Sequence, residues 1–171
     1  SANELASLLA GKDLGRYTKD AVSSELKSDV ESIYGKLNPS FDRTWGGLEK
    51  EPKFIMPSVW RWLLRYHRLT GNEDALQHTL LTLKKIAMGG IYDQIGGGFA
   101  RYSVDQFWFV PHFEKMLYDN AQLMTLYAEA YALSNDDEFR TVMQETFEWL
   151  QTEMMDAHGG FYSALDADSE G

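Results

Sequence analysis

Apolar residues recur at intervals of three and four along most of the chain, which is the spacing that lines one face of an α-helix. The first such stretch covers residues 20–37 and ends at Asn38-Pro39, because the residue before a proline disfavours helical backbone. The apolar positions of this predicted amphipathic helix are Val22, Leu26, Val30, Ile33 and Leu37.

A helical hairpin is predicted between residues 57 and 87. Pro57 suits the first position of a helix, and Gly71 suits the position just after its end. Asn72 can then cap the next helix, which has acidic residues in its first turn. The second helix of the pair carries an apolar stripe of Leu76, Leu80, Leu83 and Ala87.

The same arrangement recurs further along the chain. A long helix is predicted from Pro111 to Leu133. Asn135 and Glu138 have the spacing of a capping box for the next helix, which is expected to end at Gly159. The apolar residues of the first helix are Phe113, Leu117, Met124, Tyr127, Ala128 and Tyr131, and those of the second are Phe139, Val142, Met143, Phe147, Leu150 and Met154. The result is a second helical hairpin.

Three glycine pairs alternate with these helical units, each followed by an apolar residue: Gly46-Gly47, Gly97-Gly98 and Gly159-Gly160. A single pair could simply end a helix, but three in phase with helical pairs favour a repeat of the α/α solenoid or toroid type. The runs "GGIYDQI", "GGFARYSVD" and "GGFYSAL" are long enough only for small β-hairpins. The predicted fold is therefore all-α, with helical hairpins joined by short β-hairpin loops.

The chain stops at Gly171, soon after the third glycine pair and without a closing helix. A solenoid needs a terminal unit that covers its last apolar face. We therefore expect residues 1–171 to be a single domain that forms part of a longer toroidal chain.

Composition narrows the possible partners. The chain has 26 acidic and 16 basic residues, a net charge of -10, and no basic stripe among its aromatic residues, which argues against nucleic acid. It has no cysteine, so disulfides, thiolate nucleophiles and cysteine zinc sites are excluded. No apolar run approaches the roughly 20 residues of a membrane span, and no signal pattern is present at the N-terminus. We expect a cytoplasmic protein without a membrane partner.

The stretch "GGGFARYSVDQFWFVPHFEKMLYDN" concentrates the candidate chemistry. At about 100° per helical residue, His112, Lys115 and Asp119 fall on one side of the predicted helix, where Lys115 and Asp119 can pair. Glu114 and Tyr118 lie on the neighbouring face. His112 suits a general acid or base near neutral pH, and the alternative is a hydrogen-bonded histidine at a crowded helix start.

Aromatic and charged residues surround this histidine. Exposed rings in a loop suit stacking on sugars or other flat ligands. Arg101 could clamp a ligand carboxylate, or it could pair with Asp93 or Asp105. The aromatic residues of this loop, which cannot all belong to the core, are Phe99, Tyr102, Phe107, Trp108 and Phe109.

Near the C-terminus, Asp166, Asp168 and Glu170 alternate as at the start of a calcium-binding loop. Such a loop needs a bidentate glutamate at its twelfth position, and the segment before it reads as extended rather than helical. We expect carboxylates on a pocket rim and no metal. No nucleotide-binding, zinc-protease or serine-hydrolase motif is present.

The runs "GGIYDQIGGGFARYSVDQFWFVPHFEKMLYDNAQL" and "GGFYSALDADSEG" resemble the YyaL-like family of thioredoxin-domain-containing or spermatogenesis-associated proteins. The resemblance covers roughly Phe41 to Gly171. It implies a thioredoxin-like domain elsewhere in the parent chain, followed by an (α/α)6 toroid of the six-hairpin glycosidase kind, related to N-acylglucosamine 2-epimerases. The chain departs from the family pattern at Gly47-Leu48-Glu49 and at Ile55 after Lys53-Phe54.

The resemblance and the residues together predict part of an (α/α)6 toroid that binds a carbohydrate or similar small polar ligand. The expected activity is that of a sugar epimerase or isomerase without a cofactor, and the alternative is a non-catalytic carbohydrate- or protein-binding module. His112 and Asp119 are the candidate catalytic residues. The candidate substrate-binding residues are Arg101, Tyr102, Asp105, Trp108, Glu114, Lys115, Tyr118, Asp166 and Asp168.

Overall fold

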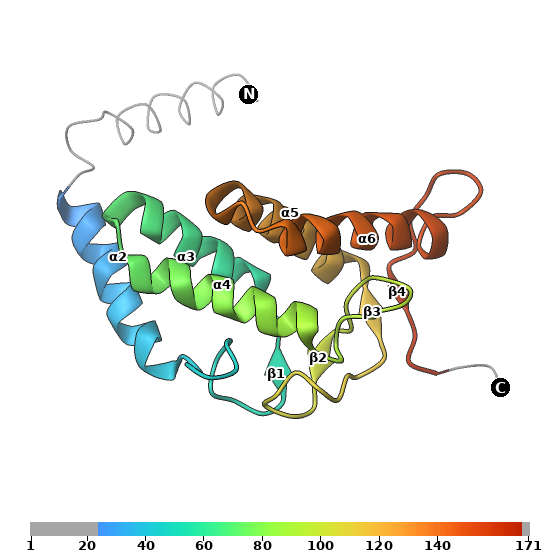
Figure 1. The fold of residues 1–171 in the computed structure, drawn as a ribbon, viewed down its shortest axis with the longest axis horizontal. Coiled ribbons are helices and arrows are strands. Elements are labelled where there is room, and N and C mark those ends of the chain that lie inside the picture. The colour runs from blue at the N-terminus through green and yellow to red at the C-terminus, as the bar shows by residue number, and fades with distance from the viewer. Residues whose placement is uncertain (1–23, 169–171) are drawn as a thin grey trace, which may run out of the picture. The chain divides into compact units, whose positions relative to one another are not determined.

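The computed structural model describes residues 24–168 (Figure 1). Within the described residues, the chain divides into two units at the boundary between residues 39 and 40. Helix α2 of the first unit covers Ser24–Leu37, and the short 3-10 helix η1, Asn38–Ser40, leads into the second unit. This confirms the described part of the helix predicted over residues 20–37, whereas Val22 lies outside the described residues. The expectation of a single domain within a longer chain stays a prediction.

The first predicted hairpin of the second unit is confirmed. Helix α3 covers Pro57–Thr70 and helix α4 covers Glu73–Met88. Gly71 has a φ of 73°, a left-handed conformation that glycine adopts without strain. Asn72 caps α4 because its side-chain oxygen accepts the amide N–H of Ala75 at 2.9 Å. These local signals determine the turn between the two helices.

The buried face of α4 differs from the predicted stripe. Leu83 and Ala87 are buried as expected, but Leu76 and Leu80 are only half-buried. The buried face includes small polar residues in place of these two leucines. Thr79 and Thr82 can be buried because their hydroxyls donate to carbonyls one turn back in α4. The buried residues of α4 are Ala75, His78, Thr79, Thr82, Leu83, Ile86 and Ala87.

The second predicted hairpin also forms, from α5 (Leu117–Ser134) and α6 (Asp137–Glu153). Its start was predicted wrongly, because residues 111–116 are extended rather than helical. Their backbone groups bond to neighbouring strands, which outweighs the helical pattern of the side chains. Phe113, expected in the core, is therefore 74% exposed.

The cap between α5 and α6 also differs from the prediction. Asn135 ends α5 in a left-handed conformation, with a φ of 55°. The N-cap of α6 is Asp136, whose side chain accepts the amide N–H of Glu138 at 3.2 Å. The capping box predicted for Asn135 is wrong by one residue, and α6 ends at Glu153 rather than at the third glycine pair.

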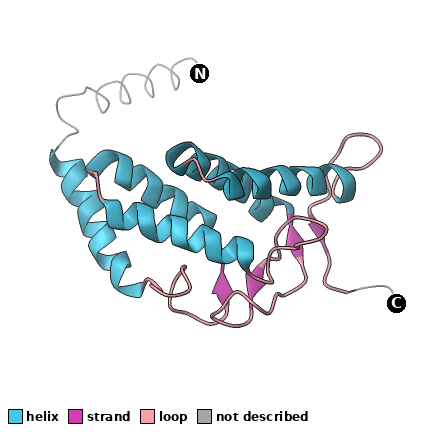
Figure 2. Cartoon of the chain, in the orientation of Figure 1, coloured by secondary structure: helices cyan, strands magenta, loops and turns pink. Residues whose placement is uncertain are grey.

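The four two-residue strands of the described chain lie beside one end of helices α3, α4, α5 and α6 (Figure 2). Strand β1 (Lys53–Phe54) pairs antiparallel with β2 (Tyr102–Ser103), and β3 (Lys115–Met116) pairs antiparallel with β4 (Ala164–Leu165). Helix α3 contacts α4 and α5, and α5 contacts α6, so the two helical hairpins stack side by side. This arrangement confirms the predicted helical fold with short β loops.

Three loops that precede or follow the helical pairs share one construction. We call residues 41–48 loop A, residues 92–99 loop B and residues 155–161 loop C. Each loop is closed by an isolated antiparallel bridge between its first and last residues. In each, an aspartate in second position accepts backbone N–H groups of the loop: Asp42, Asp93 and Asp156. The predicted internal repeat is thus present in the backbone.

Candidate functional site

A hairpin that follows loop B forms the base of the candidate site. After β2 the chain turns and returns along residues 110–112, which pair back with β2. The amide of Val104 donates to the carbonyl of Val110 at 2.9 Å, and the amide of His112 donates to the carbonyl of Tyr102 at 3.0 Å. Because β2 also pairs with β1, three short segments lie in one antiparallel layer.

Three rings form a row across one face of this layer. The ring centroids of Phe54 and Tyr102 are 4.8 Å apart, and those of Tyr102 and His112 are 4.7 Å apart with an interplanar angle of 19°. Side chains alternate between the two faces of a strand, so Lys53 and Ser103 lie on the opposite face, where both are buried. We call Phe54, Tyr102 and His112 the ring row.

One extra residue interrupts the pairing just beyond the ring row. The amide of Arg101 donates to the carbonyl of Glu114 at 2.8 Å, whereas an unbroken register would place residue 113 opposite Arg101. Phe113 is therefore a bulge, and a bulge changes the direction of the side chains that follow it. It places the Glu114 carboxylate 2.9 Å from the Arg101 guanidinium.

The same carboxylate lies beside the imidazole of His112. Nδ1 of His112 is 4.0 Å from Oε2 of Glu114 and has no hydrogen-bond partner among the described residues. The ring is held by stacking on Tyr102, while 39% of its side chain stays exposed. The ion pair of Arg101 and Glu114 thus lies beside an accessible imidazole.

A pocket of about 220 Å³ lies between the start of α3 and the first turns of α5. Phe54, the first ring of the ring row, is one of its walls. The residues that line it are Phe54, Ile55, Met56, Pro57, Ser58, Arg101, Tyr118, Asp119 and Gln122. Apolar and polar groups therefore meet in one cavity of the size of a small ligand.

Asp119 is the unusual group of this pocket. It is only 9% exposed, and its carboxyl group receives no hydrogen bond from the residues that the structure describes. Burial raises its pKa to about 6; the charge of Arg101 lowers the pKa and that of Glu114 raises it. A carboxyl group with this pKa exchanges its proton near neutral pH, which is what a general acid or base requires.

Asn120, the next residue, was not predicted from the sequence. It is fully buried, and its side-chain oxygen accepts the amide N–H of Phe99 at 2.7 Å. Its amide group donates to the carbonyls of Phe99 and Met116 at 3.1 and 2.9 Å. These bonds tie the first turn of α5 to loop B and so determine where Asp119 lies. Nothing in the local sequence indicates a contact across this distance.

Phe54 was also missed as a site residue. Burial alternates along residues 53–56: Lys53 and Ile55 are buried, whereas Phe54 and Met56 are exposed. This period of two is the signal of a strand. The run is too short to stand out from a loop. Of the predicted site residues, the structure brings together Arg101, Tyr102, His112, Glu114, Tyr118 and Asp119.

Lys115 lies apart from this group, which corrects the predicted pair with Asp119. It belongs to β3 rather than to a helix, so the i,i+4 spacing does not apply. Its ammonium group bonds to the Asp93 carboxylate at 2.9 Å and to the Gly97 carbonyl at 2.8 Å. The expected pairing of Arg101 with Asp93 or Asp105 is likewise wrong, since Arg101 pairs with Glu114.

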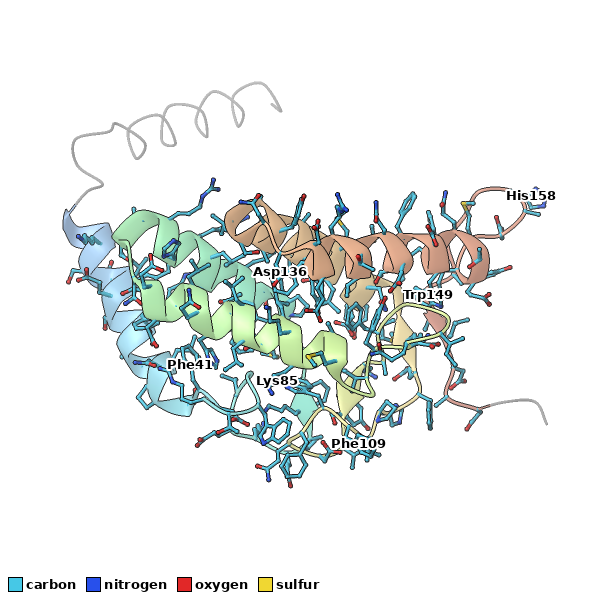
Figure 3. All side chains as sticks on the ribbon, viewed as in Figure 1. Phe41, Lys85, Phe109, Asp136, Trp149 and His158 are labelled. Atoms are coloured by element: carbon cyan, nitrogen blue, oxygen red, sulfur yellow. The ribbon has the colours of Figure 1, made fainter. Side chains whose placement is uncertain are left out.

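Trp108, a candidate substrate-binding residue, is a core side chain. The side chain is fully buried, and its indole N–H donates to the carbonyl of Trp45 at 2.8 Å. Phe99 is fully buried as well, whereas Phe107 and Phe109 are exposed, and Figure 3 shows Phe109 at the outer edge of the strand region. Loop aromatics can therefore be core residues when the loop packs on helices.

Asp105 holds the turn of the hairpin together rather than facing the pocket. Its carboxylate accepts the amide N–H groups of Phe107, Phe109 and Val110, and the hydroxyl of Ser103. Burial acts to raise its pKa, but these backbone donors lower it overall. Its carboxylate is therefore occupied by the turn.

Asp166 and Asp168 are exposed near the end of the described chain, and Glu170 lies outside the described residues. The carboxylate of Asp166 accepts the amide N–H of Ala167 at 2.7 Å. Within residues 24–168 no group of three or more histidine, aspartate or glutamate side chains is placed to hold a metal ion. In the same range no helix is long and apolar enough to cross a membrane.

No protein-family model matches the chain. Human spermatogenesis-associated protein 20 is 44% identical to it over 140 residues, which are 80% of this chain and 18% of the human protein. The chain thus spans less than a fifth of the length of this curated relative.

Solved structures of sugar epimerases share the fold. The cellobiose 2-epimerase from Bacillus thermoamylovorans superposes with a TM-score of 0.72 and 14% identity over 86% of this chain and 42% of its own. The cellobiose 2-epimerase from Spirochaeta thermophila gives a TM-score of 0.70 and 22% identity over 89% of this chain and 42% of its own. At such identities the likeness shows the fold, and it confirms the predicted α/α toroid architecture.

Because the sequence comparison covers 80% of the chain, it includes the long central motif. The resemblance to the spermatogenesis-associated proteins is confirmed by this identity and coverage. The chain therefore belongs to the family of homologues of spermatogenesis-associated protein 20, with a helical fold like that of sugar epimerases of the six-hairpin glycosidase kind.

Proposed function

We propose that the pocket beside the ring row binds a sugar, and that the protein is a sugar epimerase or isomerase. The observation that carries the proposal is the buried carboxyl group of Asp119, whose pKa of about 6 places its proton exchange near neutrality. The similarity of the fold to that of cellobiose 2-epimerases supports the choice of a sugar, although fold alone does not determine a substrate.

The surroundings of Asp119 fit a small polyhydroxylated ligand. Arg101, Tyr118 and Gln122 line the same pocket and offer donors for hydroxyl groups. Phe54 lines it too and provides an aromatic surface for the C–H groups of a sugar ring. A neutral polar ligand suits the pocket, because the single cation of its lining already bonds to Glu114.

The proposed chemistry is proton transfer next to a carbonyl group of the opened sugar. His112 removes the proton from the carbon beside the carbonyl, and Glu114 stabilises the imidazolium that forms. The C–H electron pair becomes part of an enediolate. Asp119 in its protonated form then supplies a proton. Delivery of the Asp119 proton to the same carbon from the opposite face gives the epimer. Delivery to the former carbonyl carbon, with the hydroxyl proton of the neighbouring carbon passing to the former carbonyl oxygen, gives the aldose–ketose isomer. The imidazolium of His112 then loses its proton to solvent and the Asp119 carboxylate takes one up, which restores both groups.

A second candidate is a non-catalytic module that binds a protein partner. The observation that favours it is an exposed apolar set on the hairpin after loop B, held rigidly by the buried Trp108. Exposed apolar residues that gather on one element are typical of interaction surfaces. The set consists of Val104, Phe107, Phe109, Val110 and Phe113.

Proton exchange in D₂O separates the two candidates. We expect the chain, incubated with cellobiose or D-mannose, to replace the proton at the carbon next to the carbonyl with deuterium, which ¹H NMR follows directly. Asp119→Asn keeps the shape of the side chain but cannot exchange a proton, and it should reduce the rate about 100-fold or more.

Asp29→Asn is the matched control, because Asp29 is an exposed aspartate of α2 that does not line the pocket. It should leave the exchange rate unchanged. If the chain causes no deuterium incorporation and no change in the NMR signals of either sugar, the enzyme is ruled out and the binding module is favoured. Equal rates in both variants would show that Asp119 is not the acid.

A further inference from the structure

Loops A and B are each completed by a lysine from a strand further along the chain, β1 for loop A and β3 for loop B. In loop A, the Lys53 ammonium lies 2.6 Å from the Asp42 carboxylate and also donates to the carbonyl of Gln106 at 3.0 Å. In loop B, the Lys115 ammonium lies 2.9 Å from the Asp93 carboxylate. In both, one carboxylate oxygen holds the backbone of the loop and the other holds the lysine.

Each of these lysines also lies over an indole ring. The Lys53 ammonium is 5.1 Å from the Trp108 ring, and the Lys115 ammonium is 5.0 Å from the Trp149 ring. Figure 3 shows Trp149 on α6 beside loop B. The two strands, β1 and β3, each lead directly into the first helix of a pair. The same strand–helix element therefore closes loop A and loop B.

The second helix of the same pair packs on the first glycine of each loop. A Cβ atom at Gly46 would lie 2.5 Å from the Cα atom of Thr82 in α4, and one at Gly97 would lie 2.6 Å from the Glu145 carbonyl in α6. Both glycines have positive φ angles, 69° and 78°. Loops A and B are thus enclosed by a lysine strand on one side and by a helix on the other.

Loop C has the same backbone but none of these contacts in the described chain. As in the other loops, the amide of the aspartate, Asp156, donates to the carbonyl of the second glycine, Gly160, at 2.8 Å. The first glycine, Gly159, has a φ of 85°, and a Cβ atom there would meet nothing within 4 Å. No lysine or arginine of residues 24–168 pairs with Asp156.

The bridge residues show the same contrast. Tyr92 and Phe99, which close loop B, are 3% and 0% exposed, whereas Met155 and Phe161, which close loop C, are 38% and 50% exposed. Figure 3 shows His158 at the free tip of loop C, away from the helices. Loop C therefore presents an aspartate, an open glycine and apolar side chains on one surface.

We propose that loop C is a docking surface for a further helical pair of the same repeat, whose leading strand brings a lysine to Asp156 and whose second helix packs on Gly159. The contacts of loops A and B indicate the chemistry of this partner. It offers a lysine ammonium group to the aspartate, followed by a helix whose backbone lies close to the glycine. Because the curated relative is several times longer than this chain, the source that we propose is a segment of such a longer polypeptide.

A peptide with the sequence of residues 113–126 provides the test, since it contains the Lys115 strand and the start of the helix that completes loop B. We expect the amide NMR signals of Gly159 and Gly160 in the ¹⁵N-labelled chain to shift saturably on adding it. The same peptide with Lys115→Met should give shifts at least about tenfold smaller at equal concentration, because loss of a charged hydrogen bond costs a tenfold change in affinity or more.

Variants of the chain make the result specific. Asp156→Asn keeps the turn, because an amide oxygen still accepts the backbone N–H groups, but it removes the charge and should abolish the shifts. Asp166→Asn should leave them unchanged. The absence of saturable shifts, or equal shifts with the Lys115→Met peptide, would overturn the proposal. Shifts at Gly159 that depend on the concentration of the chain alone would assign the surface to a second copy instead.

Discussion

Asp42 and Asp119 are almost equally buried, at 7% and 9% exposed, yet their pKa values move in opposite directions. Burial raises the pKa of both. At Asp42 the Lys53 ammonium and the amide N–H groups of Trp45 and Thr44 reverse the effect and lower the pKa. At Asp119 the charge of Arg101 lowers the pKa by less than burial raises it, and the pKa rises to about 6. The partners of a buried carboxylate, more than its burial, thus separate a structural group from a reactive one.

The largest effect on stability is expected when Asp42, like Asp119, has no lysine bonded to its carboxylate. Lys53→Met removes its buried counter-ion and should lower the free energy of unfolding by about 4 kcal/mol, because the negative charge left behind stays buried without an opposite charge. Urea denaturation followed by circular dichroism measures this. Lys50→Met, at an exposed lysine nearby, should change the free energy of unfolding by less than about 0.5 kcal/mol.

The next effect has the opposite sign. Because the pKa of Asp119 is about 6 in the folded chain and near 3.8 when unfolded, the folded state holds the extra proton between these values. Stability therefore falls as the pH rises from about 4 to 6. Asp119→Asn removes this loss and should raise the free energy of unfolding at pH 7 by about 2 kcal/mol.

The measurement is the difference in the free energy of unfolding between the Asp119→Asn variant and the original chain at pH 4, 5, 6 and 7. The difference is needed because His78, whose pKa burial lowers to about 4, contributes a slope of the other sign, with stability lost as the pH falls from 6.5 to 4. A difference that does not change with pH would mean that Asp119 is already ionised at pH 4.

A smaller effect compares the aspartates of loops B and C. Burial raises the pKa of Asp93, but the Gly96 N–H, the Lys115 ammonium and the Ile95 N–H hold it at about 2. Asp93→Asn should lower the free energy of unfolding at pH 7 by about 1.5 kcal/mol, since a charged hydrogen bond is lost. The cost should vanish as the pH falls from 4 to 2. Asp156→Asn should cost less than about 0.5 kcal/mol, and equal costs would remove the distinction between the two loops.

The smallest effect concerns the surroundings of Asp119. Glu114→Gln removes a charge that raises the pKa of Asp119 and releases Arg101, whose charge lowers it. Both changes lower the pKa, by less than about one unit, because burial is the main cause of its rise. ¹³C NMR titration of the carboxyl carbon measures it. An increase in the pKa would show that Arg101 turns away from the pocket when its partner is lost.

Local signals predicted most of the helical boundaries. Pro57, Gly71 and Asn72 have the stated roles in α3 and α4, because caps and turns depend on neighbouring residues alone. The internal repeat was also predicted, since glycines with positive φ recur at each loop. These features depend on backbone conformation within a few residues of the chain.

The candidate site was predicted only in part. His112, Lys115 and Asp119 were expected on one side of a helix, but that helix starts only at Leu117, and Lys115 bonds to Asp93 instead of Asp119. The extended backbone of residues 111–116 results from hydrogen bonds to strands 10 or more residues away, such as that between His112 and Tyr102. Such pairing outweighs a helical pattern of side chains, and no periodicity reveals it.

The sequence by itself determined the helical hairpins, the turns between them and the repeated aspartate–glycine loops, because each depends on short stretches of chain. Only the tertiary structure decided which buried carboxylates have a lysine or hydrogen-bond partner. Lys53 reaches Asp42 and Lys115 reaches Asp93 through strands, whereas Asp119 is buried by the packing of α5 without a hydrogen bond from the described residues. The charge state of a buried group depends on all its neighbours in space, and those come from distant parts of the chain.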